Sequence, residues 1–366
     1  MPELIIGGHK AKIPVIQGGM SVGISLSGLA SAVANQGGIG VIGAAGIGML
    51  EPDFNTDFRG ANQRALRKEI RKAKELTDGI IGVNIMMACT DCDDLMLAAV
   101  EEGADLVFLG AGLPLKIPKT LTQDRLEKVS TRIIPIVSSA RAAKVIFQYW
   151  SKKYYQVPDA LVVEGPLAGG HLGFKKEQIE DPANALDMII PEVISVIKLF
   201  EEQFHKNIPV IAAGGIFTGA DIYKFIQMGA QGVQMATRFV GTHECDASIK
   251  FKDLYLQCKK DDLVIIDSPL GLPGRAIKNQ YLEDVFRGNR KPFNCPWQCL
   301  KTCDFKETPY CIASALTHAK KGKLEKGFAF AGTNAYRVDK IVSVKELIEV
   351  LLEEYQEAAA LQEPTL

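Results

Sequence analysis

The residues best suited to proton-transfer chemistry lie in a glycine-rich segment, residues 164–174, that contains a single histidine. A short apolar run at 160–163 precedes the segment, so we predict a buried strand that ends at Glu164. Gly169 and Gly170 let the backbone approach a flat or bulky ligand closely, and the His171 imidazole can exchange protons near neutral pH. The segment is therefore either the edge of an active site or a glycine-rich turn with an incidental solvated histidine.

The composition is that of an ordinary globular protein: 366 residues, 47% hydrophobic and 23% charged, with a formal net charge of −1. This charge gives no electrostatic reason to expect a nucleic-acid partner. The N-terminus lacks the basic region and apolar core of a signal peptide, and the apolar stretches fall short of the ~20 residues that a membrane span needs. We therefore expect a cytoplasmic protein that acts on a small molecule, without a membrane partner.

Eight short apolar runs recur in the first 241 residues, separated by turns and amphipathic segments. The runs are 14–19, 39–42, 80–86, 106–110, 133–137, 160–164, 209–213 and 232–236. Because each run is continuously apolar, we predict strands that are covered on both faces, as in parallel sheets. Eight such units favour a (β/α)8 TIM barrel of class α/β. An open doubly wound sheet fits less well, because residues 17–20 lack the Gly-x-Gly-x-x-Gly turn.

The chain divides into three predicted parts. Residues 1–241 form the barrel, with helices expected at 25–36, 62–77, 92–102, 140–152, 185–204 and 220–228. Residues 242–325 are irregular and rich in turns, which predicts a smaller cap or insertion with a helix-like stretch at 245–262. Residues 326–366 comprise an apolar segment at 327–333, which could return to the barrel, and a closing helix at 343–360 that packs on it.

Glycine or a small polar residue ends nearly every predicted strand, where a barrel places its active site. These residues either serve turn geometry alone or leave room for a large planar ligand. The clearest positions are Gly214 and Gly215 after the seventh run and Gln234, Met235, Ala236 and Thr237 at the eighth. Backbone N–H groups there favour a phosphate over plain turns. A phosphate on a planar cofactor in a barrel indicates flavin mononucleotide (FMN).

Several segments together resemble, in order, the nitronate monooxygenase family (formerly 2-nitropropane dioxygenases), which includes the FMN-dependent enoyl-ACP reductase II enzymes. The matching segments are 14–20, 82–86, 164–173, 209–216, 234–239 and 275–280. The resemblance implies FMN at the barrel mouth and His171 as the catalytic base. It also implies these cofactor contacts: Gly18, Gly19 and Met20 along the ring, Asn84 as a hydrogen-bond partner, Glu164, Gly169 and Gly170 beside the cofactor, and Gly214, Gly215 and Gln234 to Thr237 around the phosphate.

Three positions depart from the family pattern. Glu164 stands where many nitronate monooxygenases have glutamine and is closer to the enoyl reductase branch; Leu167 replaces an acidic residue and Ala236 a common glycine. We therefore predict a nitronate monooxygenase that uses O2, with an NAD(P)H-dependent enoyl-ACP reductase II-like enzyme as the alternative. A non-redox barrel enzyme that binds a sugar phosphate and a binding module without catalysis are the rivals of other classes. A homodimer is a further expectation that the sequence leaves open.

Four cysteines cluster in the predicted cap at positions 295, 299, 303 and 311. On a helix, the spacing of the first three would place them on one face. Four thiolates can hold zinc or an iron–sulfur cluster, but this spacing is usual for neither, and the family resemblance implies no metal. We therefore expect buried or reactive thiols, keep metal binding as the alternative, and interpret Cys89 and Cys92 as incidental.

Overall fold

Eight parallel strands form a closed barrel in the computed structural model, which describes residues 1–119, 121, 129–291 and 293–361. In the order in which they pair around the ring, the strands are β3 (Val15–Gln17), β4 (Ile39–Gly43), β5 (Ile80–Met86), β6 (Leu106–Gly110), β7 (Arg132–Val137), β8 (Leu161–Glu164), β10 (Val210–Ala213) and β11 (Gly232–Met235). The predicted (β/α)8 barrel is confirmed, and every strand overlaps an expected apolar run.

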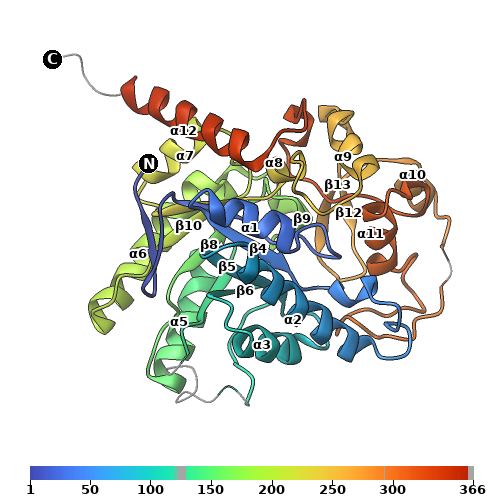
Figure 1. Cartoon of the computed structure of the whole chain (residues 1–366), viewed down its shortest axis with the longest axis horizontal. Coiled ribbons are helices and arrows are strands. Elements are labelled where there is room, and N and C mark those ends of the chain that lie inside the picture. Colours follow the sequence, from blue (N-terminus) through green and yellow to red (C-terminus); the bar gives the residue numbers. More distant parts are fainter. Residues whose placement is uncertain (120, 122–128, 292, 362–366) are drawn as a thin grey trace.

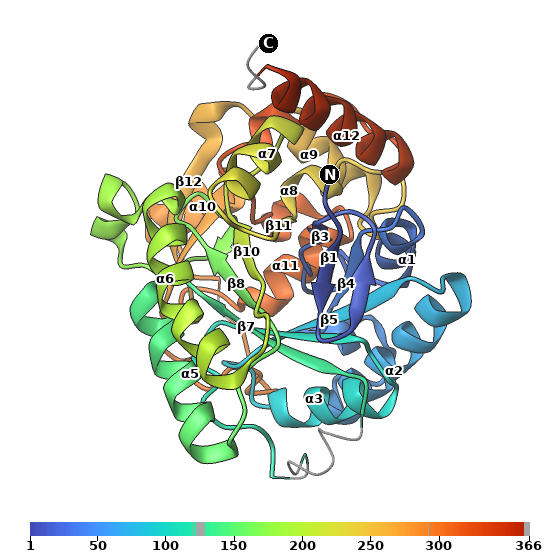
Figure 2. The ribbon, with the colours of Figure 1, turned by 90° about the vertical axis from the view of Figure 1, so that its left-hand side faces the viewer.

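Helices surround the barrel, as Figure 2 shows. They include α1 (Ser27–Asn35), α2 (Phe58–Leu76), α3 (Cys92–Glu101), α5 (Ala140–Tyr154), α6 (Leu186–Phe204) and α7 (Gly219–Gln227), with the short α8 (Thr237–Val240) after the last strand. All five residues of β4 and of β6 are buried, since their outer face packs on helices and their inner face fills the barrel. This double coverage is the reason for the continuous apolar runs.

An N-terminal hairpin that the sequence analysis did not predict closes one end of the barrel. Its strands are β1 (Leu4–Ile6) and β2 (His9–Ala11). Leu4 and Ile6 belong to the same buried cluster as the barrel interior, which includes Phe108. Strands of three residues are too short to show a clear alternation, so local sequence could not reveal them. The hairpin leaves only the opposite end of the barrel available for a ligand.

The cap lies over that open end and contains a sheet that was also not predicted (Figure 1). Strands β12 (Leu263–Asp267) and β13 (Pro273–Ile277) pair in antiparallel fashion, and β13 also pairs with the two-residue strand β9 (Gly170–His171). Helices α9 (Ile249–Leu256), α10 (Gln280–Phe286) and α11 (Ile312–Lys320) belong to the same region. Residues 268–272, within the part that the sequence analysis describes as rich in turns, form the tip of the hairpin between β12 and β13.

The segment 327–333 does not supply a barrel strand. Phe330 forms an isolated bridge with Ala276 of β13 instead, and residues 332–334 contact loops at the barrel mouth. Helix α12 (Val344–Ala360) then packs on α7, where the Tyr223 and Tyr355 rings lie 5.4 Å apart. The boundaries of the three parts stay a prediction, and residues 362–366 of the third part lie outside the described residues. No helix among the described residues is long and apolar enough to cross a lipid bilayer.

Candidate active site

One cavity of about 290 Å³ lies at the open end of the barrel, beneath the cap. All fourteen residues that the sequence analysis proposed for the site line this cavity: Gly18, Gly19, Met20, Asn84, Glu164, Gly169, Gly170, His171, Gly214, Gly215, Gln234, Met235, Ala236 and Thr237. Its volume is near the lower end of the range for pockets that hold a drug-sized ligand. The structure therefore brings the predicted residues together, whereas their roles stay predictions.

The cap holds the histidine in place. Gly170 and His171 form β9, which pairs with Arg275 and Gly274 of β13. The buried Arg275 guanidinium donates hydrogen bonds from Nη1 to the carbonyl oxygens of Pro166 (2.6 Å) and Ala168 (2.7 Å). Burial of this guanidinium lowers its pKa to about 10. The segment at 164–174 is therefore an ordered wall of the cavity rather than a free turn.

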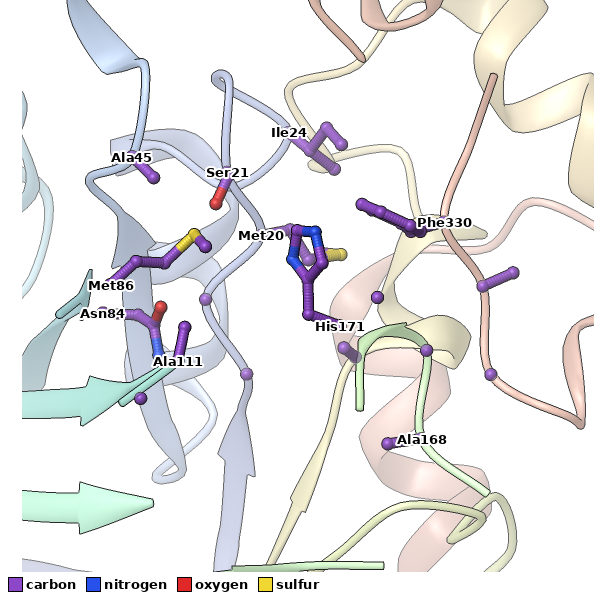
Figure 3. A pocket seen from close by; sticks show the side chains of 18 of the residues that line it. Met20, Ser21, Ile24, Ala45, Asn84, Met86, Ala111, Ala168, His171 and Phe330 are labelled. Atoms are coloured by element: carbon purple, nitrogen blue, oxygen red, sulfur yellow. The ribbon is translucent and has the colours of Figure 1, made fainter. Parts of the chain in front are cut away.

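The His171 side chain points into the cavity, with Phe330 beside it (Figure 3). The two rings meet edge to face with centroids 4.9 Å apart. Protein surrounds the imidazole, and this burial lowers its pKa to about 4, because a charged ring would lose its hydration. His171 keeps some accessible surface only because it faces the cavity. The ring is consequently neutral throughout the physiological pH range.

Ser268, at the end of β12, determines how His171 is protonated. Its Oγ lies 2.7 Å from His171 Nε2 and accepts a hydrogen bond from the Leu270 N–H at 3.2 Å. Among the described residues, Nε2 is the only acceptor in reach of the Ser268 hydroxyl proton. We therefore assign the serine as the donor to Nε2 and the imidazole proton to Nδ1.

Three polar side chains face the cavity with no protein partner among the residues that the structure describes: Asn84, Glu164 and Gln234. Desolvation raises the pKa of Glu164 to about 7. Although surrounded by protein, Glu164 keeps accessible surface on its cavity side. Buried polar groups usually have hydrogen-bond partners, so a bound ligand with donors and acceptors along one edge fits these three side chains.

Glycine is required at several points of the wall. Gly214 and Gly215 adopt left-handed φ values of 94° and 86°, and a Cβ on Gly19 would lie 2.5 Å from the Cβ of Asn84. By contrast, a Cβ on Gly170 would meet no atom within 4 Å, since this glycine borders open space. These positions form a cradle of bare backbone, which fits a planar ring and a phosphate.

The segment 330–334 completes the wall and was not assigned to the site from the sequence. Its backbone and side chains bind three strand-end loops: Gly332 N–H donates to Thr237 Oγ1 (3.0 Å), Thr333 N–H to the Leu167 carbonyl (3.1 Å) and Asn334 Nδ2 to the Gly215 carbonyl (2.7 Å). The Tyr255 hydroxyl donates to the Phe330 carbonyl. The only sequence signal was the apolar, glycine-bounded composition of 327–333, which does not indicate a partner.

The segment that carries the first three cap cysteines is not helical, so these cysteines do not share a helix face. Residues 295–303 form bends and turns, and Cys311 precedes α11. All four thiols are free. Among the described residues, no three histidine, cysteine or acidic side chains are arranged to hold a single metal ion.

We expect Glu164, not His171, to produce the pH dependence near neutrality. A carboxyl group whose pKa is raised to about 7 is protonated below that pH and ionised above it, whereas the neutral His171 titrates near pH 4. The pH profile of kcat/KM should show a break near pH 7, and Glu164→Gln should remove this break. A break that persists in the variant would refute this assignment.

The same shift predicts how Glu164 affects stability. Because the folded-state pKa is raised, the stabilisation relative to the unfolded chain is present below the ordinary carboxyl pKa and is lost as the pH rises through about 7. As the pH rises from 5 to 8, the Tm of the wild-type protein without ligand should therefore fall relative to the Tm of Glu164→Gln.

Comparison with known proteins identifies relatives over most of the chain. The family model described as nitronate monooxygenase matches residues 3–104 and 95–354. A probable nitronate monooxygenase of Staphylococcus saprophyticus is 28% identical over 307 residues, which cover 77% of this chain and 80% of the relative. A relative from Mycobacterium tuberculosis is 29% identical over 277 residues and is named (3aS,4S,5R,7aS)-5-hydroxy-7a-methyl-1-oxo-octahydro-1H-indene-4-carboxyl-CoA dehydrogenase. The matched region covers 76% of this chain but just under two thirds (66%) of that relative.

Solved structures show the same fold. FabK from Thermotoga maritima superposes with a TM-score of 0.71 and 30% identity, covering 95% of this chain and 94% of that one. The nitroalkane oxidase from Streptomyces ansochromogenes gives a TM-score of 0.72 at 20% identity, covering 96% and 98% of the two chains, and supports the fold alone.

Proposed function

The chain belongs to the nitronate monooxygenase family, whose members are flavin-dependent oxidoreductases, and we propose that it oxidises alkyl nitronates with O2 by means of bound FMN. The observation that carries the proposal is the neutral, buried His171 on the wall of the cavity that gathers every residue expected to hold FMN. The nitronate monooxygenase name of the staphylococcal relative supports the substrate class.

The chain's own residues would hold the cofactor in the cradle described above. Gly18, Gly19 and Met20 would lie along the ring, and Asn84, Glu164 and Gln234 would meet its polar edge. Gly214 and Gly215, with Met235, Ala236 and Thr237, would surround the phosphate with backbone donors. When bound, FMN would accept electrons from the substrate and pass them to oxygen.

The acid–base state of His171 favours a nitronate over a neutral nitroalkane as the substrate. A nitroalkane must lose its α-proton to a base, and an imidazole with a pKa of about 4 is a weak proton acceptor. A nitronate has already lost that proton and needs only its charge matched by hydrogen bonds. The Nδ1–H of His171 can supply such a bond, while its role as the catalytic base stays a prediction.

A second candidate function is an NAD(P)H-dependent enoyl-ACP reductase II-like activity. The similarity to FabK from Thermotoga maritima over 95% of the chain favours it, as does a carboxyl group at position 164. Apolar cap side chains, among them Leu300, Ile312 and Leu316, extend the cavity and could receive an acyl group. Neither the nicotinamide nor the acyl partner is assigned by the geometry.

Anaerobic reduction of the bound flavin separates the two candidates. Bleaching of the flavin absorbance by an alkyl nitronate alone supports the monooxygenase, and bleaching by NADH or NADPH with subsequent reoxidation by an enoyl thioester supports the reductase. A purified protein that lacks flavin absorbance and gains none on addition of FMN would refute both candidates. That result would favour a non-redox barrel that binds a sugar phosphate.

Ser268 is expected to act as a positioning residue for His171. Ser268→Ala removes the 2.7 Å contact with Nε2, and loss of one hydrogen bond of ~0.5–1.5 kcal/mol corresponds to a decrease in kcat of about two- to tenfold. KM and FMN content should change little, and Ser268→Thr, which keeps the hydroxyl, should restore most of the rate. Equal losses in the alanine and threonine variants would instead indicate a packing role.

A further inference from the structure

A second, smaller cavity adjoins the candidate active site and is lined by all four cap cysteines, Cys295, Cys299, Cys303 and Cys311. In each of the six pairs, the two thiols are close enough for the charge on one to raise the pKa of the other. All four are free. Four cysteines from a segment without a continuous helix therefore face one common space.

The backbone of this segment is shaped so that the thiols converge. Gln298, directly before Cys299, adopts a left-handed φ of 46°, a conformation that non-glycine residues rarely adopt. Cys311 directly precedes α11; burial raises the pKa of its thiol, and the backbone N–H groups of Ser314 and Ala313 offset part of that rise. Such N–H groups stabilise a thiolate in the same way that they stabilise other anions at a helix start.

The surroundings of the four thiols are mostly apolar. Phe293, Leu300, Phe305 and Ile312 line the same cavity, and burial raises the pKa of Cys299 to about 12. Four thiolates cannot share such a space without a cation, because each charge would be desolvated and repelled by the others. Burial also raises the pKa of Cys303, and the neighbouring Thr308 hydroxyl offsets part of that rise, so a hydroxyl donor lies close to this thiol.

The spacing of the thiols argues against a single ion. Zinc holds four thiolates at ~2.3 Å from one point, and no three ligating side chains of the described residues converge in that way. The cavity that the thiols line together with five other residues has a volume of only about 10 Å³, so the turns that carry the thiols would have to separate to admit a cluster. An iron–sulfur cluster holds its cysteine ligands further apart, because iron and sulfide atoms lie between them.

We propose that the four cap thiols bind an iron–sulfur cluster as thiolate ligands, next to the candidate active site. Cys299, Leu300 and Ile312 line both cavities, so these residues form the shared wall between cluster and pocket. Three buried donors of the same segment, the Trp297 indole N–H and the hydroxyls of Thr308 and Tyr310, have no hydrogen-bond partner among the described residues. Donors of this kind are available to second-shell interactions with a cluster.

Metal analysis of the full chain, produced with iron supplementation and purified anaerobically, tests the proposal. We expect about four iron atoms and four acid-labile sulfides per chain, with broad absorbance near 400 nm that bleaches with dithionite and a low-temperature EPR signal in the reduced state. Anaerobic reconstitution with ferrous iron and sulfide should reach the same content. Stoichiometric zinc, or a folded protein that takes up neither iron nor sulfide under reconstitution, would overturn the proposal.

Cysteine variants locate the site. Cys299→Ser and the less buried Cys303→Ser should each lose most of the iron and sulfide, whereas Cys258→Ser, which removes a buried thiol outside the cluster, should retain the wild-type content. Circular dichroism and thermal unfolding monitor folding in each variant. Wild-type iron and sulfide in both folded cluster variants would assign the metal to another site and refute the proposal. None of these readouts requires FMN or turnover.

Discussion

Replacing His171 with alanine is expected to lower kcat about 10²–10⁴-fold, the range for loss of a side chain that transfers or holds a proton in the reaction. His171 is the one histidine among the described residues that line the cavity, and Ser268 and Phe330 hold the orientation of its imidazole. The variant should keep its FMN, because the glycine cradle and the three polar side chains are unaltered. Steady-state turnover and the ratio of flavin to protein absorbance measure the two quantities.

The matched control is His243→Ala, which removes an exposed histidine that does not line the cavity. It should leave turnover unchanged. His171→Gln separates hydrogen bonding from proton transfer, because glutamine retains hydrogen-bonding capacity but cannot exchange a proton near neutral pH. Turnover near the wild-type level in His171→Gln would show that hydrogen bonding suffices, and unchanged turnover in flavin-loaded His171→Ala would remove this residue from the mechanism.

The second large effect is expected from Gly214→Ala, which should weaken FMN binding at least about tenfold, or ~1.4 kcal/mol. Gly214 has a φ of 94°, where an L-residue costs ~1–2 kcal/mol. The new Cβ would also lie 2.8 Å from the carbonyl oxygen of Gly165. Since the backbone of residue 214 fixes the position of the Cβ and the oxygen belongs to the backbone of Gly165, relief requires the end of β10 to move away from the segment that carries His171.

Gly288→Ala provides the control for the backbone cost alone. Gly288 has a similar φ of 81°, but a Cβ there would meet no atom within 4 Å, and the residue does not line the cavity. FMN titration of the apoprotein, followed by flavin fluorescence, measures affinity, and circular dichroism verifies folding. An affinity in folded Gly214→Ala equal to that of Gly288→Ala would contradict the proposed placement of the cofactor.

The barrel and the position of its ligand could be predicted because they depend on short-range patterns. Buried parallel strands require continuous apolar residues, and the runs at 80–86 and 106–110 coincide with β5 and β6. The barrel fold then places all strand ends at one edge, which is why fourteen residues spread from Gly18 to Thr237 could be assigned to one cavity. The two hairpins were missed because one has three-residue strands and the other contains turn-forming residues.

The chemical state of the site was decided by tertiary structure. The sequence by itself determined that a histidine follows the sixth strand beside two glycines. Its neutral state depends on burial beneath the cap, and its tautomer on Ser268, 97 positions further along the chain. The wall around it depends on Arg275 and on residues 330–334. These contacts leave no local pattern, because a loop residue can meet any distant partner whose backbone brings it within hydrogen-bond distance.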